Sequence, residues 1–277
     1  MLIKFLGTGA AEGIPATFCR CAVCENARRT KGKEIRMRTG VAIDDALLID
    51  FSPDSLTQSV RFDIDYTGLQ ALLVTHTHSD HFAVDDLIQR SPYNSMNRTA
   101  PILGVYGNAV MEEKLKAALS FDENAAQSME IAAVRGGQKF RIGEYQVLAL
   151  KTIHMETEDS LLYLISKEGK HYLHALDSAE LTEETYELLF KEGICLDAVS
   201  LDCTFGLLEE EFYGHMNFRQ NLRVKERLER LGLADAHTKF YLTHISHYAG
   251  CTQEDLEAEA GRHGFAVAYD GLCVQIV

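Results

Sequence analysis

The sequence predicts an α/β protein built as a four-layer αββα sandwich. One observation is the order of the expected elements: a meandering set of strands is followed by a second set, with helices in between. This order suits two sheets packed face to face under outer helices. The other is the even spread of turn residues, with only four prolines in 277 residues and no linker or short repeat. We therefore expect a single domain spanning residues 1–277.

The first half of the chain gives strands from apolar runs that end at turn residues, and helices from runs that follow a capping residue. The expected strands are Leu2–Leu6, the hairpin Gly40–Phe51 with its turn at Asp44 and Asp45, Leu69–Thr75 and Ile102–Tyr106. The expected helices are Pro53–Phe62, Asp80–Gln89 and Asn108–Leu119.

The second half follows the same patterns and completes the second sheet. The expected strands are a strand–turn–strand unit at Ile131–Ile153, the hairpin Leu161–Ser166 and His171–Leu176, then Leu196–Asp202, Phe240–Thr243 and Phe265–Val277. The expected helices are Thr182–Lys191, Asn217–Leu231 and Gln253–His263.

Composition and charge argue against several classes of function. The chain has 27 Lys and Arg against 41 Asp and Glu, a formal net charge of −14. This balance disfavours a nucleic-acid partner, because phosphate binding depends on basic side chains. The basic stretch from Arg28 to Arg38 is equally compatible with a solvated loop and with a phosphate-facing surface. No apolar run reaches the roughly 18 residues of a membrane span. Seven cysteines suit a reducing compartment, so we expect a cytoplasmic protein, with a homodimer among its possible assemblies.

The glycines near the N-terminus do not form a dinucleotide-binding fingerprint. Gly7, Gly9 and Gly13 follow the spacing G-x-G-x-x-x-G, which is one residue too long. Pro15 and a group of cysteines follow where the helix of the fingerprint would begin. The sequence therefore argues against NAD as a cofactor.

The most informative motif is the run from His76 to His81, which has the pattern His-x-His-x-Asp-His. It follows Leu72–Thr75, an apolar run that we expect to be a buried strand. At the end of a strand, His76 and His78 project the same way and can share one metal. Asp80 and His81 lie past the bend, within reach of a second metal. A paired-metal site polarises an ester and supplies a hydroxide at neutral pH, so the motif predicts hydrolytic chemistry.

This motif resembles the signature of the metallo-β-lactamase superfamily. That superfamily adds a third histidine for the first metal, a bridging aspartate and a late histidine for the second metal, each at a strand end. His154, Asp177 and His244 follow expected strands in that order. The resemblance implies seven ligands of two catalytic metals: His76, His78 and His154 for one, Asp80, His81 and His244 for the other, and Asp177 as the bridge.

A separate group of cysteines predicts a structural zinc site in an N-terminal loop at about residues 15–38. Cys19, Cys21 and Cys24 offer three thiolates, and a closed tetrahedral zinc site needs a fourth ligand. His247 lies three residues beyond His244 and can turn outward to complete the set. Three reduced surface thiols without a metal are the alternative interpretation.

Four segments narrow the resemblance to one branch of the superfamily, the branch that contains the phosphoribosyl cyclic phosphodiesterase. These segments are Leu6–Pro15, Cys19–Cys24, Thr243–His247 and Tyr269–Gly271. The similarity implies a structural zinc on the three cysteines and His247, beside two divalent catalytic metals that are Zn, Mn or Fe.

The same branch places a histidine after an Asp-Cys pair that follows a late strand. Asp202 and Cys203 match that pair, and His215 then matches the histidine, which implies a position near the leaving group. The intervening Thr204–Tyr213 differs freely from the pattern of the branch, so the match is less specific there. Asp80 and His215 are the expected catalytic residues.

Together these patterns predict a dinuclear metal-dependent phosphodiesterase that acts on a small, cyclic phosphate ester. A relative that acts in quinone-cofactor synthesis without clear hydrolysis is one alternative, and a tRNA-processing-type nuclease is another. A β-lactamase or thioester hydrolase shares the fold, but neither is expected to carry the cysteine cluster. A binding or oxygen-chemistry role would follow from an incomplete ligand set, and a purely structural metal protein is the remaining alternative.

Overall fold

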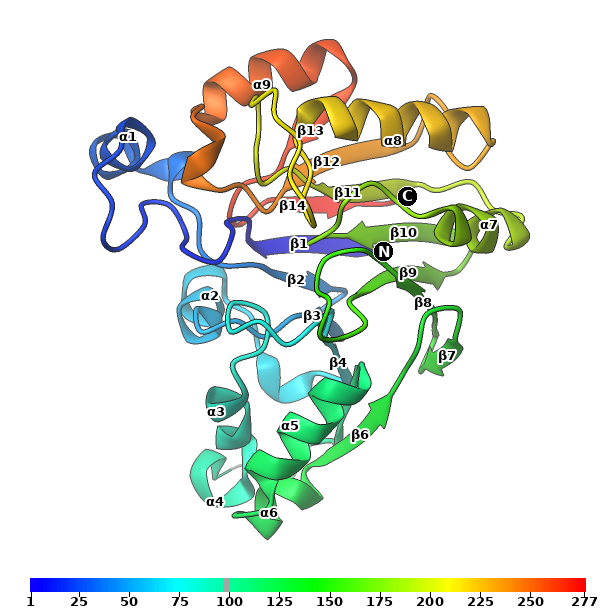
Figure 1. Cartoon of the computed structure of the whole chain (residues 1–277). Coiled ribbons are helices and arrows are strands. Elements are labelled where there is room, and N and C mark those ends of the chain that lie inside the picture. Colours follow the sequence, from blue (N-terminus) through cyan, green and yellow to red (C-terminus); the bar gives the residue numbers. More distant parts are fainter. Residues whose placement is uncertain (97–99) are drawn as a thin grey trace.

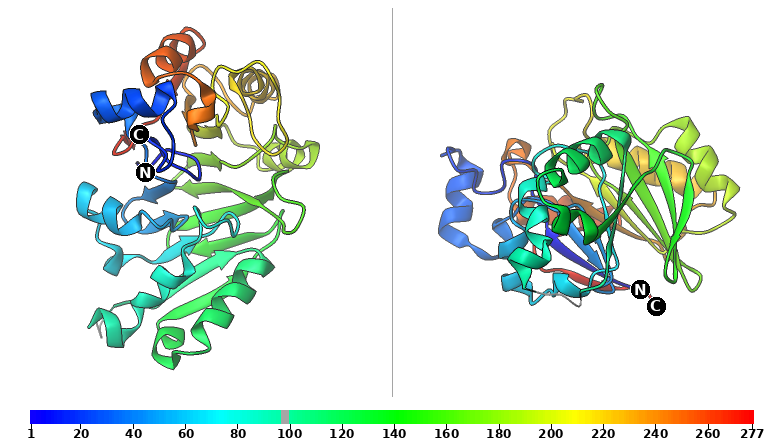
Figure 2. Two further views of the ribbon diagram at one scale, coloured as in Figure 1. Left: turned by 60° about the vertical axis from the view of Figure 1, so that its left-hand side comes forward. Right: turned by 90° about the horizontal axis from the view of Figure 1, so that it is seen from below.

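The computed structural model describes residues 1–96 and 100–277, which form two β-sheets packed face to face between outer helices (Figure 1 and Figure 2). The first sheet contains β1 (Leu2–Gly7), β2 (Gly40–Ile43), β3 (Leu47–Ile49), β4 (Ala71–Leu73), β5 (Leu103–Gly107), β6 (Met129–Ala133) and β14 (Cys273–Gln275). The second contains β7 (Lys139–Ile142), β8 (Tyr145–Lys151), β9 (Leu161–Lys167), β10 (Lys170–Ala175), β11 (Ala198–Asp202), β12 (Lys239–Thr243) and β13 (Phe265–Val267). The predicted four-layer arrangement is confirmed.

Both sheets contain parallel and antiparallel strands, and the ends of the parallel strands form the edge at which a site can lie. The strand orders are β14-β1-β2-β3-β4-β5-β6 and β13-β12-β11-β10-β9-β8-β7. Strands β3 to β6 are parallel in the first sheet, and β10 to β13 are parallel in the second. Parallel strands end at one edge of their sheet, and ligands in such sheets bind at the carboxyl ends.

The helices begin at capping residues that the sequence supplies. In the described residues they are α1 (Ala22–Thr30), α2 (Ser55–Phe62), α3 (Val84–Leu87), α4 (Pro92–Ser95), α5 (Ala109–Leu119), α6 (Glu123–Gln127), α7 (Glu183–Lys191), α8 (Phe218–Arg230) and α9 (Gln253–Arg262). Asn108 caps α5 by accepting the N–H of Met111, and Asn217 with Gln220 forms a capping box at α8. No helix of the described residues is long and apolar enough to cross a membrane.

The core follows the two-residue alternation of the strands. On β9, Tyr163 and Ile165 lie in the apolar cluster between the two sheets, whereas Leu164 faces the cluster that α7, α8 and α9 cover. A third cluster packs the outer face of the first sheet against α5, through Met111 and Leu115. These three clusters hold the strand ends at fixed positions.

The C-terminal strand prediction was wrong, because Phe265–Val277 forms two strands in different sheets. Strand β13 pairs with β12 in the second sheet, and β14 pairs with β1 in the first. The chain crosses between the sheets at Asp270 and Gly271. Gly271 has a φ of +92°, and a Cβ there would lie 2.6 Å from Phe62, so this turn requires glycine. The crossing brings the two termini side by side (Figure 2).

The predicted helix from Asp80 starts later than expected, at Val84. The backbone of the preceding turn is bound elsewhere: the N–H of Phe51 donates to the carbonyl of His81, and the N–H of Ala83 donates to the carbonyl of Phe51. This pairing with the end of the first sheet holds residues 80–83 in an irregular turn, with the side chains of Asp80 and His81 buried.

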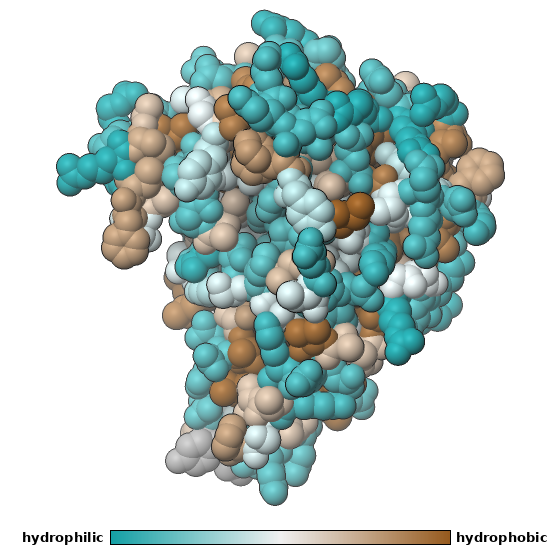
Figure 3. All heavy atoms as spheres, viewed as in Figure 1, coloured by the Kyte–Doolittle hydropathy of each residue, from teal (hydrophilic) through white to brown (hydrophobic). Residues whose placement is uncertain are grey.

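The N-terminal cysteine-rich segment, predicted to be a loop, contains a helix. Helix α1 buries Val23, Cys24 and Ala27 and projects with its preceding loop from one side of the molecule (Figure 1). Phe18 in that loop is 102% exposed. Hydrophobic atoms lie at the lower end of the projection, whereas its outermost atoms are hydrophilic (Figure 3). The single-domain and homodimer expectations stay predictions.

Candidate metal centre

Three residues of the site lie just after the end of a strand, and each has a left-handed backbone conformation. Asp50 comes after β3, Asp177 after β10 and His244 after β12, with φ angles of 61°, 46° and 58°. A positive φ is uncommon for residues other than glycine, and such conformations gather at functional sites. The turn that each residue makes places its side chain at the carboxyl edge of a sheet.

The first set of candidate ligands combines two loops. Nε2 of His76 lies 2.9 Å from Nδ1 of His78, which lies 3.2 Å from Nε2 of His154. The opposite nitrogens of two rings are held by outer partners: Nδ1 of His76 donates to Thr75 (3.0 Å), and Nδ1 of His154 donates to the carbonyl of Gly214 (3.1 Å). Such partners fix the tautomer that leaves Nε2 free to bind a metal.

The second set lies beside the first. Oδ2 of Asp80 lies 3.2 Å from Nε2 of His81 and 3.9 Å from Nε2 of His244. Outer partners again hold the opposite ring nitrogens. Nδ1 of His81 donates to Asp50 at 2.7 Å, and Nδ1 of His244 donates to Thr204 at 2.9 Å. Within each set, the candidate ligand atoms lie within 4.8 Å of one another.

Asp177 lies between the two sets and directs one oxygen to each. Its Oδ1 is 3.8 Å from Nε2 of His154, whereas its Oδ2 is 2.5 Å from Nε2 of His81 and 3.3 Å from Nε2 of His244. The side chain is buried. This arrangement is the one that a carboxylate bridging two cations requires.

Buried atoms without partners show that divalent cations fit these sets. Among the described residues, Nε2 of His81, Nε2 of His244 and Oδ2 of Asp177 are buried and crowd together, but no hydrogen bond of normal geometry satisfies any of them. An unsatisfied buried polar atom is costly, so a bound cation would satisfy all three at once. Imidazole and carboxylate ligands together suit Zn, Mn and Fe.

The ionisation of the two sets also favours metal binding. Burial, with a smaller contribution from His81, lowers the pKa of His76 well below its usual range, so its ring is neutral. At His81, burial opposes the charged form, but Asp177, Asp80 and Asp50 outweigh it and raise the pKa. The carboxylate field that favours a proton at the second set also favours a metal cation there.

His215 lies at the edge of the centre, in the loop between β11 and α8 as predicted. Its Nδ1 donates to Asp202 at 2.8 Å, and its ring stacks on His244 with centroids 5.6 Å apart. Burial would lower the pKa of His215, but the charge and hydrogen bond of Asp202 raise it to about 9. Asp202 therefore favours the protonated imidazole.

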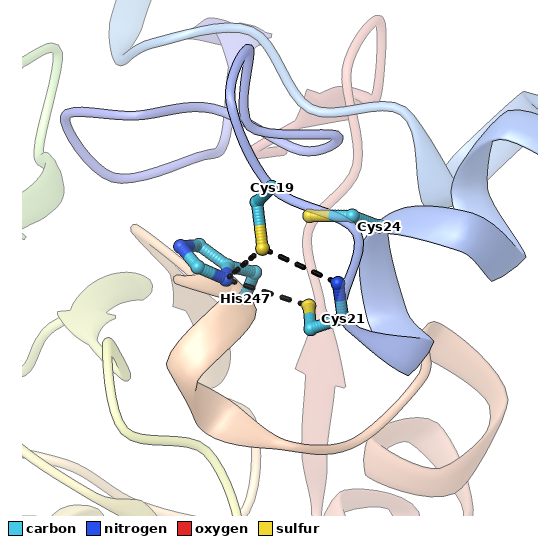
Figure 4. Close-up of side chains that lie close together, drawn as sticks. All are labelled: Cys19, Cys21, Cys24 and His247. Carbon is cyan, nitrogen blue, oxygen red and sulfur yellow. Dashed lines mark hydrogen bonds between the residues drawn. The ribbon is translucent and has the colours of Figure 1, made fainter.

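The cysteine cluster forms a third, separate set (Figure 4). The sulfurs of Cys19 and Cys21 each lie 3.5 Å from Nδ1 of His247, and Cys24 faces them from α1. Burial opposes ionisation of Cys21, but the Cys24 N–H and the side chain of His247 outweigh it and lower the pKa to about 6. Three thiols and one imidazole within 4.8 Å match a closed tetrahedral zinc site.

The outer partners of the centre were not predicted from the sequence. Asp50 accepts a hydrogen bond from His81, and Asp202 accepts one from His215. Glu12 lies 3.5 Å from Nε2 of His247. Asp50 follows the end of β3 and Asp202 ends β11, so the strand-end rule that selected Asp177 was available for both. Glu12 lies in a loop without such a signal.

The family model for the beta-lactamase superfamily domain matches residues 46–245 of this chain, which include all seven candidate ligands of the paired centre. The chain belongs to the metallo-β-lactamase superfamily. The fold of this superfamily implies divalent metal cofactors and hydrolytic chemistry.

Two solved structures share the superfamily fold along the whole chain. A diphosphatase from the PhnP family has a TM-score of 0.75 at 24% identity, over 100% of this chain and 98% of its own. Zn²⁺-bound PqqB from Methylobacterium extorquens has a TM-score of 0.74 at 18% identity, over 99% of this chain and 100% of its own. At these identities the likeness shows the fold alone.

One curated relative is similar over most of this chain. The octanoyltransferase of Porphyromonas gingivalis is 26% identical over 263 residues, which are 91% of this chain and 47% of the relative. This chain therefore spans about half the length of that protein, and the rest of the relative has no counterpart here.

Proposed function

We propose that this chain is a dinuclear metal-dependent phosphodiesterase that hydrolyses small, cyclic phosphate esters. The observation that carries the proposal is the pair of ligand sets joined by the two oxygens of Asp177, with His215 beside them, whose protonated form Asp202 favours. Two divalent cations, Zn, Mn or Fe, would occupy the sets. The first would lie on His76, His78 and His154, and the second on Asp80, His81 and His244.

Each residue of the centre has a separate task in this proposal. Cations on the two sets would polarise the phosphoryl group and lower the pKa of the attacking water. Asp177 keeps one oxygen toward each set, so that both act on the same phosphate. Asp50 and Thr204 hold the rings of His81 and His244 in the tautomers that expose Nε2.

His215 is the proposed acid for the departing oxygen. When the P–O bond breaks, the leaving alkoxide needs a proton, and the candidate metal ligands have none to give. The hydrogen bond to Asp202 favours the protonated form of His215 and orients its ring against His244. The proton passes from His215 to the leaving oxygen. His215 regains a proton from the next water molecule that is deprotonated at the centre.

The proposed substrate class rests on the net charge of the chain and on the cysteine site. A net charge of −14 disfavours a long polyanion such as tRNA and leaves small phosphate esters. The Cys19, Cys21, Cys24 and His247 set, here a structural zinc site, supports membership of the phosphoribosyl cyclic phosphodiesterase branch. A PhnP-family diphosphatase shares the fold over its full length, which favours hydrolysis of a phosphorus–oxygen bond as the reaction of this chain.

Two alternatives remain as outcomes of the test. A relative in quinone-cofactor synthesis would bind metal without hydrolysing any ester. The octanoyltransferase likeness makes octanoyl compounds a rival substrate class, although this chain covers only 47% of that relative. Turnover of cyclic and linear phosphodiesters, of octanoyl thioesters and of a lactam by one preparation separates these activities. Cleavage of thioesters alone would overturn the proposal.

The metal content of untagged protein is the first test. We expect three tightly bound metals per chain, two in the paired centre and one zinc in the cysteine site. Elemental analysis that finds one metal or none would contradict the dinuclear assignment. The same preparation then goes into the substrate panel, so metal binding and activity are judged separately.

Replacement of the bridge gives a second test. Asp177→Ala removes both oxygens that face the two sets, so we expect phosphodiesterase kcat to fall by more than the roughly 10–100-fold typical of losing an outer-shell partner. Far-ultraviolet circular dichroism should stay unchanged. Asp85→Ala, an exposed aspartate on α3, is the matched control. Unchanged turnover with both metals still bound would show that Asp177 is not the bridge.

A further inference from the structure

A polar network surrounds Thr77, the residue between His76 and His78 of the first set. Oε1 of Glu158 accepts the backbone N–H of Thr77 at 3.1 Å and its hydroxyl at 2.7 Å. Nζ of Lys114 donates to the same hydroxyl oxygen at 2.6 Å. The hydroxyl therefore accepts from the ammonium and donates to the carboxylate, which satisfies it on both sides. Thr77 is 8% exposed, so this network lies at the edge of the protein interior.

The second oxygen of Glu158 binds a different element. Oε2 accepts from Nδ2 of Asn108 at 2.6 Å, and the same amide group donates to the carbonyl of Asp159 at 2.9 Å. Oδ1 of Asn108 accepts the N–H of Met111 and caps α5. One carboxylate thus joins the metal-site loop after β4 to the N-terminus of α5.

Glu158 also belongs to the loop that carries His154. His76 and His78 flank Thr77, and His154 lies four residues before Glu158. The three histidines of the first set therefore come from two loops, and the hydrogen bonds of Glu158 connect those loops directly. The second set is held by Asp50 and Thr204 instead, so Glu158 faces only one half of the centre.

We infer that Glu158 is a positioning residue for the first metal set, with Thr77 as the group through which it acts. This inference rests on the proposed function, because it assumes that His76, His78 and His154 bind a cation. Glu158 holds the backbone between His76 and His78 at a fixed distance from the loop of His154. Without it, the three ligating nitrogens lose their common geometry, whereas the second set keeps its own partners.

Measurement of the metal affinity of the metal-loaded protein tests this inference. Equilibrium dialysis of the metal-loaded protein against buffered Mn²⁺ measures the affinity of each catalytic cation, and elemental analysis counts the zinc. We expect Glu158→Ala to weaken one catalytic cation by roughly 10–100-fold, the usual effect of removing an outer-shell partner. The other catalytic cation and the zinc should stay bound. Glu158→Gln can still accept a hydrogen bond from Thr77, so this variant should lose less of the affinity for that cation.

Controls separate positioning from a general loss of structure. Glu156→Ala changes an exposed glutamate of the same loop and should bind all three metals like the wild type. In the Thr77→Val background, where the hydroxyl is absent, Glu158→Ala should cause a smaller further loss, because the two residues act through one contact. Equal affinity in Glu158→Ala and wild type would overturn the inference, and so would equal loss of both catalytic cations with a lower Tm.

This experiment distinguishes failure of the inference from failure of the proposed function. A wild-type protein that binds two catalytic cations but cleaves no phosphodiester would refute the activity and leave the role of Glu158 intact. A wild-type protein that cleaves phosphodiesters, with a Glu158→Ala variant of unchanged Mn²⁺ affinity, would refute the role of Glu158 alone.

Discussion

At the scale of single residues, the centre depends on the nitrogen of each ring that faces away from it. Asp50 accepts from His81, Thr204 from His244 and the Gly214 carbonyl from His154. A histidine ring offers a metal only the nitrogen that carries no proton, so these acceptors decide which atom is available. His215 differs, because its carboxylate partner raises the pKa and favours the charged ring.

Substitution of His215 should distinguish leaving groups. His215→Ala removes the acid, so we expect alkyl phosphodiesters to react roughly 10²–10⁴-fold more slowly. Esters with a nitrophenolate leaving group need little protonation and should slow much less. Steady-state rates of both substrate types measure the difference, and His237→Ala, an exposed histidine before β12, is the control. Equal losses on both substrates would mean that His215 binds the phosphate and is not the acid.

The candidate ligands could be predicted from the sequence, but their supports could not. His76, His78, Asp80 and His81 form a local pattern, and the later ligands each follow an apolar run. Glu158 contacts Thr77 across 81 positions of sequence. No spacing rule connects residues so far apart, because their contact exists only after the sheets have packed.

At the scale of elements, one short segment connects the paired centre to the cysteine site. Strand β12 ends at Thr243, His244 turns into the paired centre, and η4 (His247–Ala249) begins with the imidazole that faces the cysteines. Ser246, between them, donates to Glu12, which also approaches His247. A zinc ion at the cysteine site would therefore fasten the N-terminal loop and α1 to the end of β12.

Loss of one thiolate should destabilise the protein more than it harms the chemistry. Cys21→Ser opens a closed zinc site that joins residues 19–24 to His247, and ligand binding to the folded state alone contributes to stability. We expect the free energy of unfolding to fall well beyond the ~0.5 kcal/mol typical of surface substitutions. Thermal melts measure this change, and Cys195→Ser, an exposed cysteine outside the cluster, is the control. A Cys21→Ser variant that melts like the wild type would show that the cluster is not structural.

Element types followed from apolar periodicity, whereas two boundaries depended on tertiary contacts. Phe265–Val277 looks like one strand because its apolar residues continue through the crossing at Gly271. The helix expected at Asp80 begins at Val84, because the turn before it pairs with Phe51. Helix α1 was missed because its cysteines suggested a metal-binding loop, although Val23 and Ala27 are also spaced for a buried helical face.

At the scale of the whole molecule, a buried polar cluster joins the two ends of the chain. Asp270 accepts from the N–H and hydroxyl of Thr8 and from the N–H of Met37. Arg36 donates to Thr8 and to the carbonyl of Ala268 in the same cluster. The cluster lies where the chain crosses from β13 to β14, and the carbonyl of Thr8 accepts the N–H of Ile245, beside His244. Closure of the sandwich and placement of the paired centre therefore share these contacts.

The protonation of Asp270 gives a pH dependence that can be measured. Burial raises the pKa of this carboxyl to about 6, although the N–H groups of Met37 and Thr8 act in the opposite direction. The folded pKa exceeds the unfolded value of 3.8, so the folded state holds the proton more tightly. The stability from this group is complete below pH 3.8 and is lost as the pH rises through 6. The full change is about 3 kcal/mol.

Asp270→Asn removes this titration. The amide is neutral, like the protonated carboxyl that the folded wild type holds at pH 4. The free energy of unfolding of the variant should therefore fall less than that of the wild type between pH 4 and pH 7. It rises relative to that of the wild type over this range, which changes the gap between the two proteins. Urea unfolding at both pH values measures the gap. Asp85→Asn, at an exposed site, should follow the wild-type profile. Parallel profiles for Asp270→Asn and the wild type would show that Asp270 does not hold a proton in the closed sandwich.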